Sequence, residues 1–151
     1  FLAHVPSTGT VLDLGCGYGD FINNVVAARR IGVDVWPGIT DYLQKDVEAV
    51  VGPVNDLSAI ADGSVDYAFA SNLFEHVGQQ EFAQALASLA TKLSPDGCLT
   101  ILQPNYRYAY REYFDDFTHV SVYSHTSLCD FLAANANLRR NTCRFRRLGR
   151  S

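Results

Sequence analysis

The segment Thr10–Asp20, TVLDLGCGYGD, constrains the fold more than any other stretch of this 151-residue chain. Its first half is apolar and predicts a short buried strand. Glycines follow at positions 15, 17 and 19, and an apolar pattern with helical spacing begins at Asp20. A strand that runs through glycines into a helix lets the backbone approach a bound molecule where a side chain would block it. The segment therefore predicts a ligand site.

The remainder of the chain alternates predicted strands with predicted helices. With the strand at 11–14, the expected strands are 30–35, 48–52, 65–70 and 98–103. The expected helices are 20–30, a weak one around Tyr42, an amphipathic one over Gln79–Leu93, and a last one that Thr126 caps. A turn, SPDG, separates the amphipathic helix from the final strand, and an aromatic loop fills 104–123. This order predicts one α/β domain: a doubly wound, mainly parallel sheet in three α/β/α layers.

Composition and charge exclude several classes of partner. The chain is 48% hydrophobic, and no apolar run approaches the roughly 20 residues of a membrane span, so no membrane partner is expected. Residues 1–138, the expected domain, hold all sixteen acidic residues but only six of the twelve Lys/Arg, which disfavours nucleic acid. The other six are arginines within 139–151, expected to form a solvated tail or an edge strand; a nucleic-acid methyltransferase would rest on them alone.

The four cysteines are widely spaced along the chain and form no C-x-x-C pair. Neither a zinc site nor a disulfide framework is therefore expected. A reducing, cytoplasmic setting is the simpler interpretation.

Asp34 narrows the kind of ligand. It lies 19 residues after Gly15, at the end of the second strand, where an acid commonly holds ribose hydroxyls. That position suits both a nicotinamide dinucleotide and S-adenosylmethionine. The dinucleotide fingerprint has a third glycine where this chain has Asp20, and a carboxylate there would repel a pyrophosphate at a helix N-terminus. The residues thus favour a nucleoside, with an NAD-dependent oxidoreductase as the alternative.

Five segments in order resemble the class I S-adenosylmethionine-dependent methyltransferases, more narrowly the type 11-like methyltransferase domain. They are VLDLGCGYG, IGVDV, DGSVDYAFASNLFEHV, LSPDGCLTILQPN, and the stretch from Pro104 into the final helix. The resemblance covers about residues 9–135. It implies S-adenosylmethionine as cofactor, S-adenosylhomocysteine as product, and methyl transfer to a small-molecule acceptor. A non-catalytic cofactor-binding module is the alternative.

The chain departs from the family at its ends and after the third strand. The family's sheet has seven strands and ends in an antiparallel hairpin, whereas this chain offers at most one weak strand after Ala136, around 142–145. Part of the hairpin and the helix before the first strand are therefore expected to be missing. The family often has Gly-Asp-Ala after the third strand; here Gly-Pro-Val occupies 52–54, and Asn55 or Asp56 is expected to replace the adenine-binding Asp.

The resemblance implies a role for each cofactor residue. Gly15, Cys16 and Gly17 would lie against the methionine part of the cofactor, whose amino group Asp13 would support. Asp34 would hold both ribose hydroxyls. The remaining expected cofactor residues are Gly19 in the turn, Val35 and Trp36 over the adenine, Asn55 and Asp56, and Ser71, Asn72 and Leu73 beside the sulfonium.

Methyl transfer is an in-line displacement at the sulfonium carbon, and an oxygen nucleophile also needs a base. His119, within the aromatic loop, is the expected general base and His76 the second candidate; structural hydrogen bonding and helix capping are the alternatives. Asp115–Asp116 suggest a metal, but none is expected. Expected substrate contacts are Asn105, Tyr106, Arg107, Tyr113 and Asp116.

Overall fold

A computed structural model describes residues 5–135 of the chain. Within them, five parallel strands form one sheet in the order β3-β2-β1-β4-β5. The strands are β1 (Thr10–Leu14), β2 (Arg29–Asp34), β3 (Val47–Val51), β4 (Val65–Ser71) and β5 (Leu93–Leu102). The chain moves outward from β1 in one direction and then resumes at β4 on its other side, so a crevice forms at the carboxyl ends of these two strands. This confirms the doubly wound parallel sheet.

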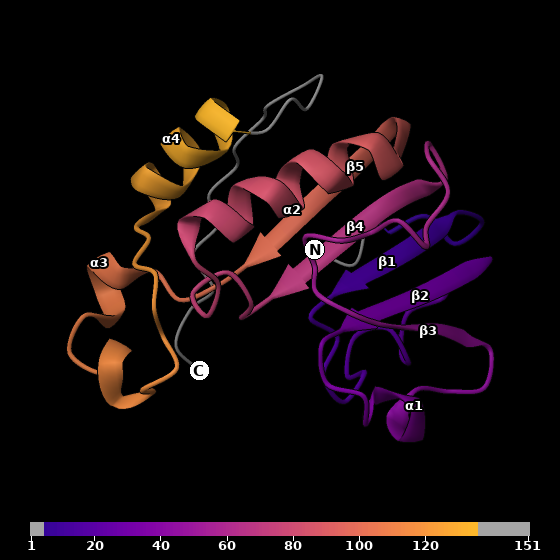
Figure 1. Ribbon diagram of the computed structural model, residues 1–151, viewed down its shortest axis with the longest axis horizontal. Coiled ribbons are helices and arrows are strands. Elements are labelled where there is room, and N and C mark those ends of the chain that lie inside the picture. The colour runs from indigo at the N-terminus through magenta and orange to yellow at the C-terminus, as the bar shows by residue number, and fades with distance from the viewer. Residues whose placement is uncertain (1–4, 136–151) are drawn as a thin grey trace.

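Each face of the sheet has its own hydrophobic cluster, because successive strand residues point to opposite sides. Leu12 and Ala68 belong to the cluster under α2 (Gln79–Lys92) and α4 (His125–Asn135). Figure 1 shows α2 lying across β4 and β5 with α4 beside it. Val11 and Tyr67 belong to the opposite cluster, which residues 16–27 and α1 (Ile39–Tyr42) cover.

The helix expected over 20–30 is absent from the structure, which forms consecutive turns there. The apolar pattern is only partly buried: Ile22 is inaccessible but Val26 is 75% exposed. The Arg30 guanidinium donates to the carbonyls of Ile22 and Asn23, both at 3.1 Å. Since a side chain satisfies these carbonyls, no helical ladder continues from them. The sequence argument against a pyrophosphate assumed a helix that begins at Asp20. Because that helix is absent, the argument no longer applies.

The expected SPDG turn lies inside a strand. β5 begins at Leu93, directly after α2, and pairs with β4 through a register shift between Val65 and Tyr67. At Gly97 an added Cβ would lie 2.6 Å from the Val65 carbonyl oxygen. The glycine therefore permits a bulge that keeps this irregular segment in the sheet.

The amphipathic helix α2 is confirmed to within one residue of its expected end. Phe82, Leu86 and Leu89 are buried on one face. The Phe82 ring stacks on Phe74, with centroids 3.7 Å apart, and on Phe131 of α4, at 4.9 Å. This aromatic column joins α2 to the segment after β4 and to the last helix.

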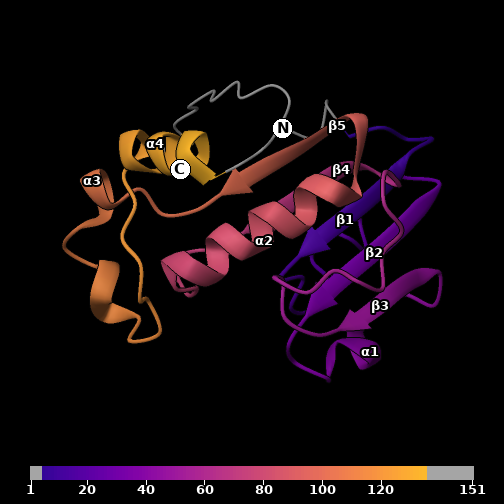
Figure 2. The ribbon, with the colours of Figure 1, turned by 45° about the horizontal axis from the view of Figure 1, so that its top comes forward.

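Two short helical elements interrupt the expected loop at 104–123: α3 (Tyr106–Ala109) and η2 (Tyr113–Asp115). Figure 2 shows both projecting beyond the carboxyl end of β5. α4 then begins at His125, and the Ser124 hydroxyl accepts from the backbone N–H of Ser127 at 3.1 Å. Ser124 therefore provides the cap expected from Thr126.

Several expectations concern residues beyond 135. The weak strand at 142–145, the arginine-rich segment 139–151 and the domain limit at 138 lie outside the described residues.

Cys129 is disulfide-bonded, which corrects the expectation from cysteine spacing, while Cys16 and Cys98 are free. Between residues 5 and 135, no helix has the length and apolar character needed to cross a membrane.

Candidate active site

The glycine turn after β1 depends on left-handed backbone conformations. Gly15, Gly17 and Gly19 have φ angles of +68°, +49° and +80°, which glycine adopts without steric cost. The Gly15 N–H donates to the Val33 carbonyl of β2 at 2.8 Å. A Cβ on Gly15 would lie 2.8 Å from Leu73 Cδ1. Position 15 therefore requires glycine both for its dihedral angle and for its contact with the segment after β4.

The Asp34 carboxylate, at the end of β2, holds the same turn from the other side. Its Oδ2 accepts from the Gly17 N–H and its Oδ1 from the Trp36 N–H, both at 2.9 Å. A carboxylate oxygen has a second lone pair, so both oxygens can still accept from a ligand hydroxyl. Asp34 thus lies beside the glycine turn, where the sequence predicted it; its role toward a ribose stays a prediction.

A cavity of about 280 Å³ opens over this turn at the carboxyl ends of β1 and β4. It is close in size to the smallest common small-molecule sites, which begin near ~300 Å³. The lining residues are Asp13, Gly15, Cys16, Gly17, Tyr18, Asp20, Phe21, Phe69, Ser71 and Asn72. Six of these were expected cofactor residues. The sequence did not predict the three aromatic residues of the lining, Tyr18, Phe21 and Phe69, because nothing in it distinguished them from the core pattern.

Asp13 is a buried carboxyl in the lining, only 3% exposed. Burial raises its pKa from 3.8 to about 7; the backbone N–H of Ile22 opposes this shift, and the nearby Asp34 charge adds to it. An opposite charge within a few ångströms favours the ionised form of a carboxyl. Asp13 is therefore suited to pair with an amino group that enters the cavity. Its predicted contact with the cofactor amine has this physical basis.

Cys16 also lines the cavity but is not a nucleophile. Burial raises the pKa of its thiol to about 12, so the thiol stays protonated at neutral pH. Its Sγ lies against Gly32 of β2, where an added Cβ would be 2.9 Å away. Cys16 is a small side chain that lets the turn lie close to the sheet.

Three aromatic rings gather at the outer edge of the cavity. Tyr18 is 5.3 Å from Trp36 and 4.9 Å from Tyr42, measured between ring centroids. Trp36 also lies against Gly38, where a Cβ would be 2.3 Å from the indole. All three rings are partly exposed, Trp36 at 39%. The adenine wall predicted at Trp36 stays a prediction, and Tyr18 and Tyr42 join Trp36 there.

The residues expected to complete the adenine site lie outside the cavity lining. Asn55 donates to Gln84 of α2 at 2.9 Å. The exposed Asp56 accepts from the Ser58 hydroxyl and backbone N–H, which keeps its pKa below the ordinary value. Val35 is 68% exposed. The cofactor contacts predicted for these three residues stay predictions.

The segment after β4 carries the sulfonium-side residues into a second cluster. Asn72 has a φ of +47°, a left-handed conformation that asparagine tolerates better than most residues, and its N–H donates to the Leu102 carbonyl at 2.8 Å. Glu75 follows three residues later and has no exposed surface. Neither of its carboxylate oxygens has a hydrogen-bond partner. Burial raises the pKa of Glu75, whereas its own backbone N–H and the charges of His76 and His119 oppose the shift.

The structure brings His76 and His119 together, although 43 residues separate them in the sequence. Their ring centroids lie 4.8 Å apart, and one ligand atom from each, with one from Glu75, fall within 4.8 Å of one another. The backbone N–H groups of Val120 and Ser121 donate to the Glu75 carbonyl, at 2.8 and 3.0 Å, which holds the two segments together. The sequence reasoning named both histidines but missed Glu75, whose signal was a glutamate directly after the apolar pair at 73–74.

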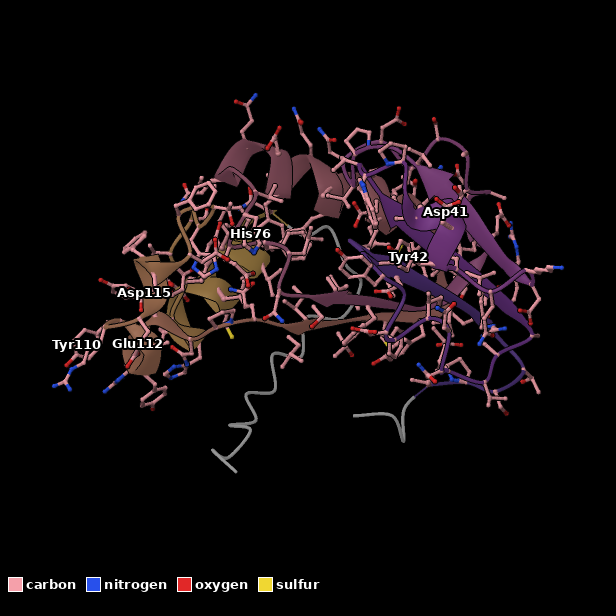
Figure 3. All side chains as sticks on the ribbon, turned by 90° about the horizontal axis from the view of Figure 1, so that it is seen from below. Asp41, Tyr42, His76, Tyr110, Glu112 and Asp115 are labelled. Carbon is pink, nitrogen blue, oxygen red and sulfur yellow. The ribbon has the colours of Figure 1, made fainter. Side chains whose placement is uncertain are left out.

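Hydrogen bonds fix how both imidazoles are turned. His119 Nδ1 is 2.5 Å from the Tyr113 carbonyl oxygen, so Nδ1 carries the proton. The Thr118 hydroxyl donates to Asp116 at 2.5 Å, and therefore accepts from His76 Nδ1, at 2.8 Å. In both rings Nε2 retains its lone pair. Figure 3 shows His76 in the same half of the molecule as Asp115, away from Asp41 and Tyr42.

The expected substrate residues have other partners in this structure. The Asn105 side chain accepts from the Arg107 N–H at 3.2 Å and contacts His125. Tyr113 is buried and donates its hydroxyl to the Ser121 carbonyl at 2.6 Å. The Tyr106 ring packs against that of Tyr113, with centroids 5.2 Å apart. Arg107 and Asp116 are exposed. Their substrate contacts stay predictions.

Comparison with known sequences identifies the family. A model described as "Methyltransferase domain" matches residues 12–101. The chain is 36% identical over 103 residues to cypemycin N-terminal methyltransferase of a Streptomyces species, covering 63% of this chain and 42% of that protein. It is 30% identical over 111 residues to trans-aconitate 2-methyltransferase of Methylobacterium nodulans, covering 69% and 42%. The chain therefore spans less than half the length of these relatives.

Solved structures share the fold. An S-adenosylmethionine-dependent methyltransferase from Archaeoglobus fulgidus superposes with a TM-score of 0.76 at 21% identity, over 88% of this chain and 62% of that one. A TehB-like S-adenosylmethionine-dependent methyltransferase from Corynebacterium glutamicum gives a TM-score of 0.57 at 26% identity, over 66% and 56%.

The parallel sheet, its strand order and the glycine turn beside an acid at the end of β2 define a class I S-adenosylmethionine-dependent methyltransferase domain. The resemblance found in the sequence is thereby confirmed. The chain belongs to the methyltransferase domain family.

Proposed function

We propose that this chain binds S-adenosylmethionine over the glycine turn and takes part in transfer of its methyl group to a small-molecule acceptor. The observation that carries the proposal is the cavity between the ends of β1 and β4, with the buried carboxyl of Asp13 in its lining. A cationic amino group suits that carboxyl, and the absence of side chains at Gly15 and Gly17 allows a ligand to approach the backbone of the turn closely.

The cofactor would lie along the carboxyl edge of the sheet. Its methionine part would contact Gly15, Cys16 and Gly17, and its ribose hydroxyls would donate to Asp34. The Tyr18–Trp36–Tyr42 rings would stack on or border the adenine, since an exposed aromatic group gains by covering a planar base. The sulfonium would lie toward Ser71 and Asn72, which line the cavity at the end of β4.

The chemistry asks mainly for alignment and exclusion of water, because the methyl group leaves an already activated sulfonium. An acceptor hydroxyl would also need a proton acceptor. His119 and His76 each retain a lone pair at Nε2, which keeps the predicted base role open to either. By their names, one of the two relatives above acts at the N-terminus of cypemycin and the other on trans-aconitate, so they do not converge on one acceptor. A small-molecule acceptor rather than nucleic acid stays a prediction from the charge pattern. The cytoplasmic setting stays a prediction that the disulfide at Cys129 does not support.

Calorimetric titration of the purified chain with S-adenosylhomocysteine tests the proposal, and Asp34→Ala is the informative variant. Loss of a carboxylate that orders the turn and accepts from the ribose is expected to weaken binding about 10- to 100-fold, the equivalent of hydrogen bonds to a charged group of about 1.5–3 kcal/mol.

Asp66→Ala is the matched control. Asp66 also accepts two hydrogen bonds, from the Thr10 N–H and the Ser94 hydroxyl, both at 2.8 Å, but at the opposite end of the sheet. This variant should lose stability and retain affinity. Binding of NAD in place of S-adenosylhomocysteine would refute the proposal, as would equal affinity losses in the two variants.

A further inference from the structure

A buried carboxylate without a partner is the starting point. Glu75 has no exposed surface, and neither oxygen has a hydrogen-bond partner. The other buried acid among residues 5–135 is Asp13; a backbone N–H favours the ionised form of each carboxyl, that of Ile22 for Asp13 and its own for Glu75, but the Glu75 oxygens have no partner of normal hydrogen-bond geometry. Buried charges in proteins are paired or coordinate metals, and an unpartnered buried carboxyl is accounted for by protonation, by a water or by an ion. For Glu75 the two imidazoles beside it favour the ion.

Two imidazoles complete the set of donors. One ligand atom each from Glu75, His76 and His119 lie within 4.8 Å of one another. Bonds of about 2.0–2.2 Å to one ion keep its ligand atoms at most about 4.4 Å apart, so binding would draw these atoms together. Both histidines are partly exposed to solvent, the His119 side chain by 10%. An ion can therefore reach the site, and water can bind to it there.

The surroundings of the two histidines match those of metal ligands. A metal-binding histidine almost always donates its second ring N–H to a carbonyl or a carboxylate-linked group, which fixes the tautomer and aims the other nitrogen. His119 donates to the Tyr113 carbonyl, and His76 donates to Thr118, which is itself bonded to Asp116. In the neutral rings both Nε2 atoms are therefore left to bind, with Asp116 Oδ2 3.8 Å from that of His119. An ion held there would occupy the lone pairs that the predicted base role needs.

We propose that Glu75, His76 and His119 form a site for one divalent transition-metal cation, of which Zn²⁺ is the representative. Imidazole and carboxylate together suit zinc and its neighbours, whereas Mg²⁺ and Ca²⁺ prefer oxygen ligands. Three protein ligands leave at least one position for water or another molecule. The site lies in the segment that follows β4 and in the loop before α4, and its existence does not depend on the methyl donor.

The test uses the whole chain without an affinity tag, stripped by a chelator and titrated with Co²⁺ followed by its visible absorption, and with Zn²⁺ by calorimetry. One ion per chain is expected. His76→Gln and His119→Gln should each weaken binding by at least about 100-fold. Thr118→Val keeps all three ligands and removes only the hydroxyl that orients His76, so a loss of about 10- to 100-fold is expected.

His125→Gln is the control, because it removes a histidine of α4 outside the cluster and should keep the affinity. Cys98→Ser should leave the Co²⁺ spectrum unchanged, which shows that the exposed thiol is not a ligand. No bound ion, or equal affinities in His125→Gln, His76→Gln and His119→Gln, would overturn the proposal. Unchanged affinity in Thr118→Val would overturn the orienting role, and this exposed substitution is not expected to prevent folding.

Titration of the same samples with S-adenosylhomocysteine separates the two proposals. Cofactor binding without a metal refutes the metal site alone. A metal without cofactor binding refutes the proposed function alone.

Discussion

The two polar sites of this molecule are built in opposite ways. At the glycine turn the groups come from two neighbouring strand ends: the Gly17 N–H donates to the Asp34 carboxylate 17 residues away, and the N–H groups of Gly15 and Cys16 donate to the Val33 carbonyl. At the Glu75 cluster the groups are side chains from segments more than 40 residues apart, joined by hydrogen bonds to the Glu75 carbonyl. A site made of local backbone survives many side-chain changes elsewhere. A site made of distant side chains depends on packing between the segments.

The buried acids sharpen this comparison, because each site contains one. Asp13 lines the cavity, where the Ile22 N–H opposes the rise of its pKa; Glu75 lies outside the cavity lining, where its own N–H opposes the rise but neither oxygen has a partner of normal hydrogen-bond geometry. In both, burial raises the pKa of the carboxyl, so each costs stability when ionised without a cation.

The largest expected effect is that of Asp13→Asn on the pH dependence of stability. The folded-state pKa of about 7 lies above the ordinary 3.8, so from pH 4 to 7 the native state holds a proton that the unfolded state has released. The free energy of unfolding of the parent protein should therefore fall as pH rises through this window, by at most about 4 kcal/mol. The asparagine variant should lose most of that decline, measured by urea denaturation without ligand.

Asp62→Asn is the control for that slope. The Lys92 ammonium holds the pKa of exposed Asp62 below 3.8, so its linkage lies at lower pH. An unchanged slope in Asp13→Asn would show that this carboxyl does not titrate between pH 4 and 7.

Glu75→Met tests the second site with the next largest effect. Methionine is similar in length and removes two buried oxygens without partners, so the free energy of unfolding of the metal-free protein should rise by about 1–3 kcal/mol. Denaturation in the presence of a chelator measures the change. A loss of stability would mean that the carboxylate already has a partner, and the contrast with Asp13 would fail.

Gly17→Ala gives the smallest change in stability and separates backbone strain from ligand contact. Gly17 and Gly63 both have positive φ, +49° and +66°, and an added Cβ meets nothing within 4 Å at either position. Each alanine variant should therefore lose about 1–2 kcal/mol of stability from backbone strain. Only Gly17 lines the cavity, so only Gly17→Ala should weaken S-adenosylhomocysteine binding. Equal affinities in the two variants would mean that the ligand does not approach the turn.

Local patterns determined much of the fold. The strands, α2 and the parallel order follow from apolar runs and their alternation, and the glycines with Asp34 located the first site. The helix after Asp20 was predicted wrongly because an apolar period reports burial, not the hydrogen bonds that Arg30 donates to the turn carbonyls. The SPDG turn was predicted wrongly because pairing with β4 keeps an irregular segment in the sheet.

The sequence by itself determined the fold class, the family and the turn that faces the cavity, because each depends on residues close together in the chain. Only the tertiary structure decided that Glu75 is buried without a partner and that His76 and His119 meet beside it. Contacts between segments more than 40 residues apart leave no periodicity in a single sequence, since they arise from the packing of β4 and its following segment against the loop before α4. The glycine turn is encoded locally, whereas the Glu75 cluster exists only in the folded chain.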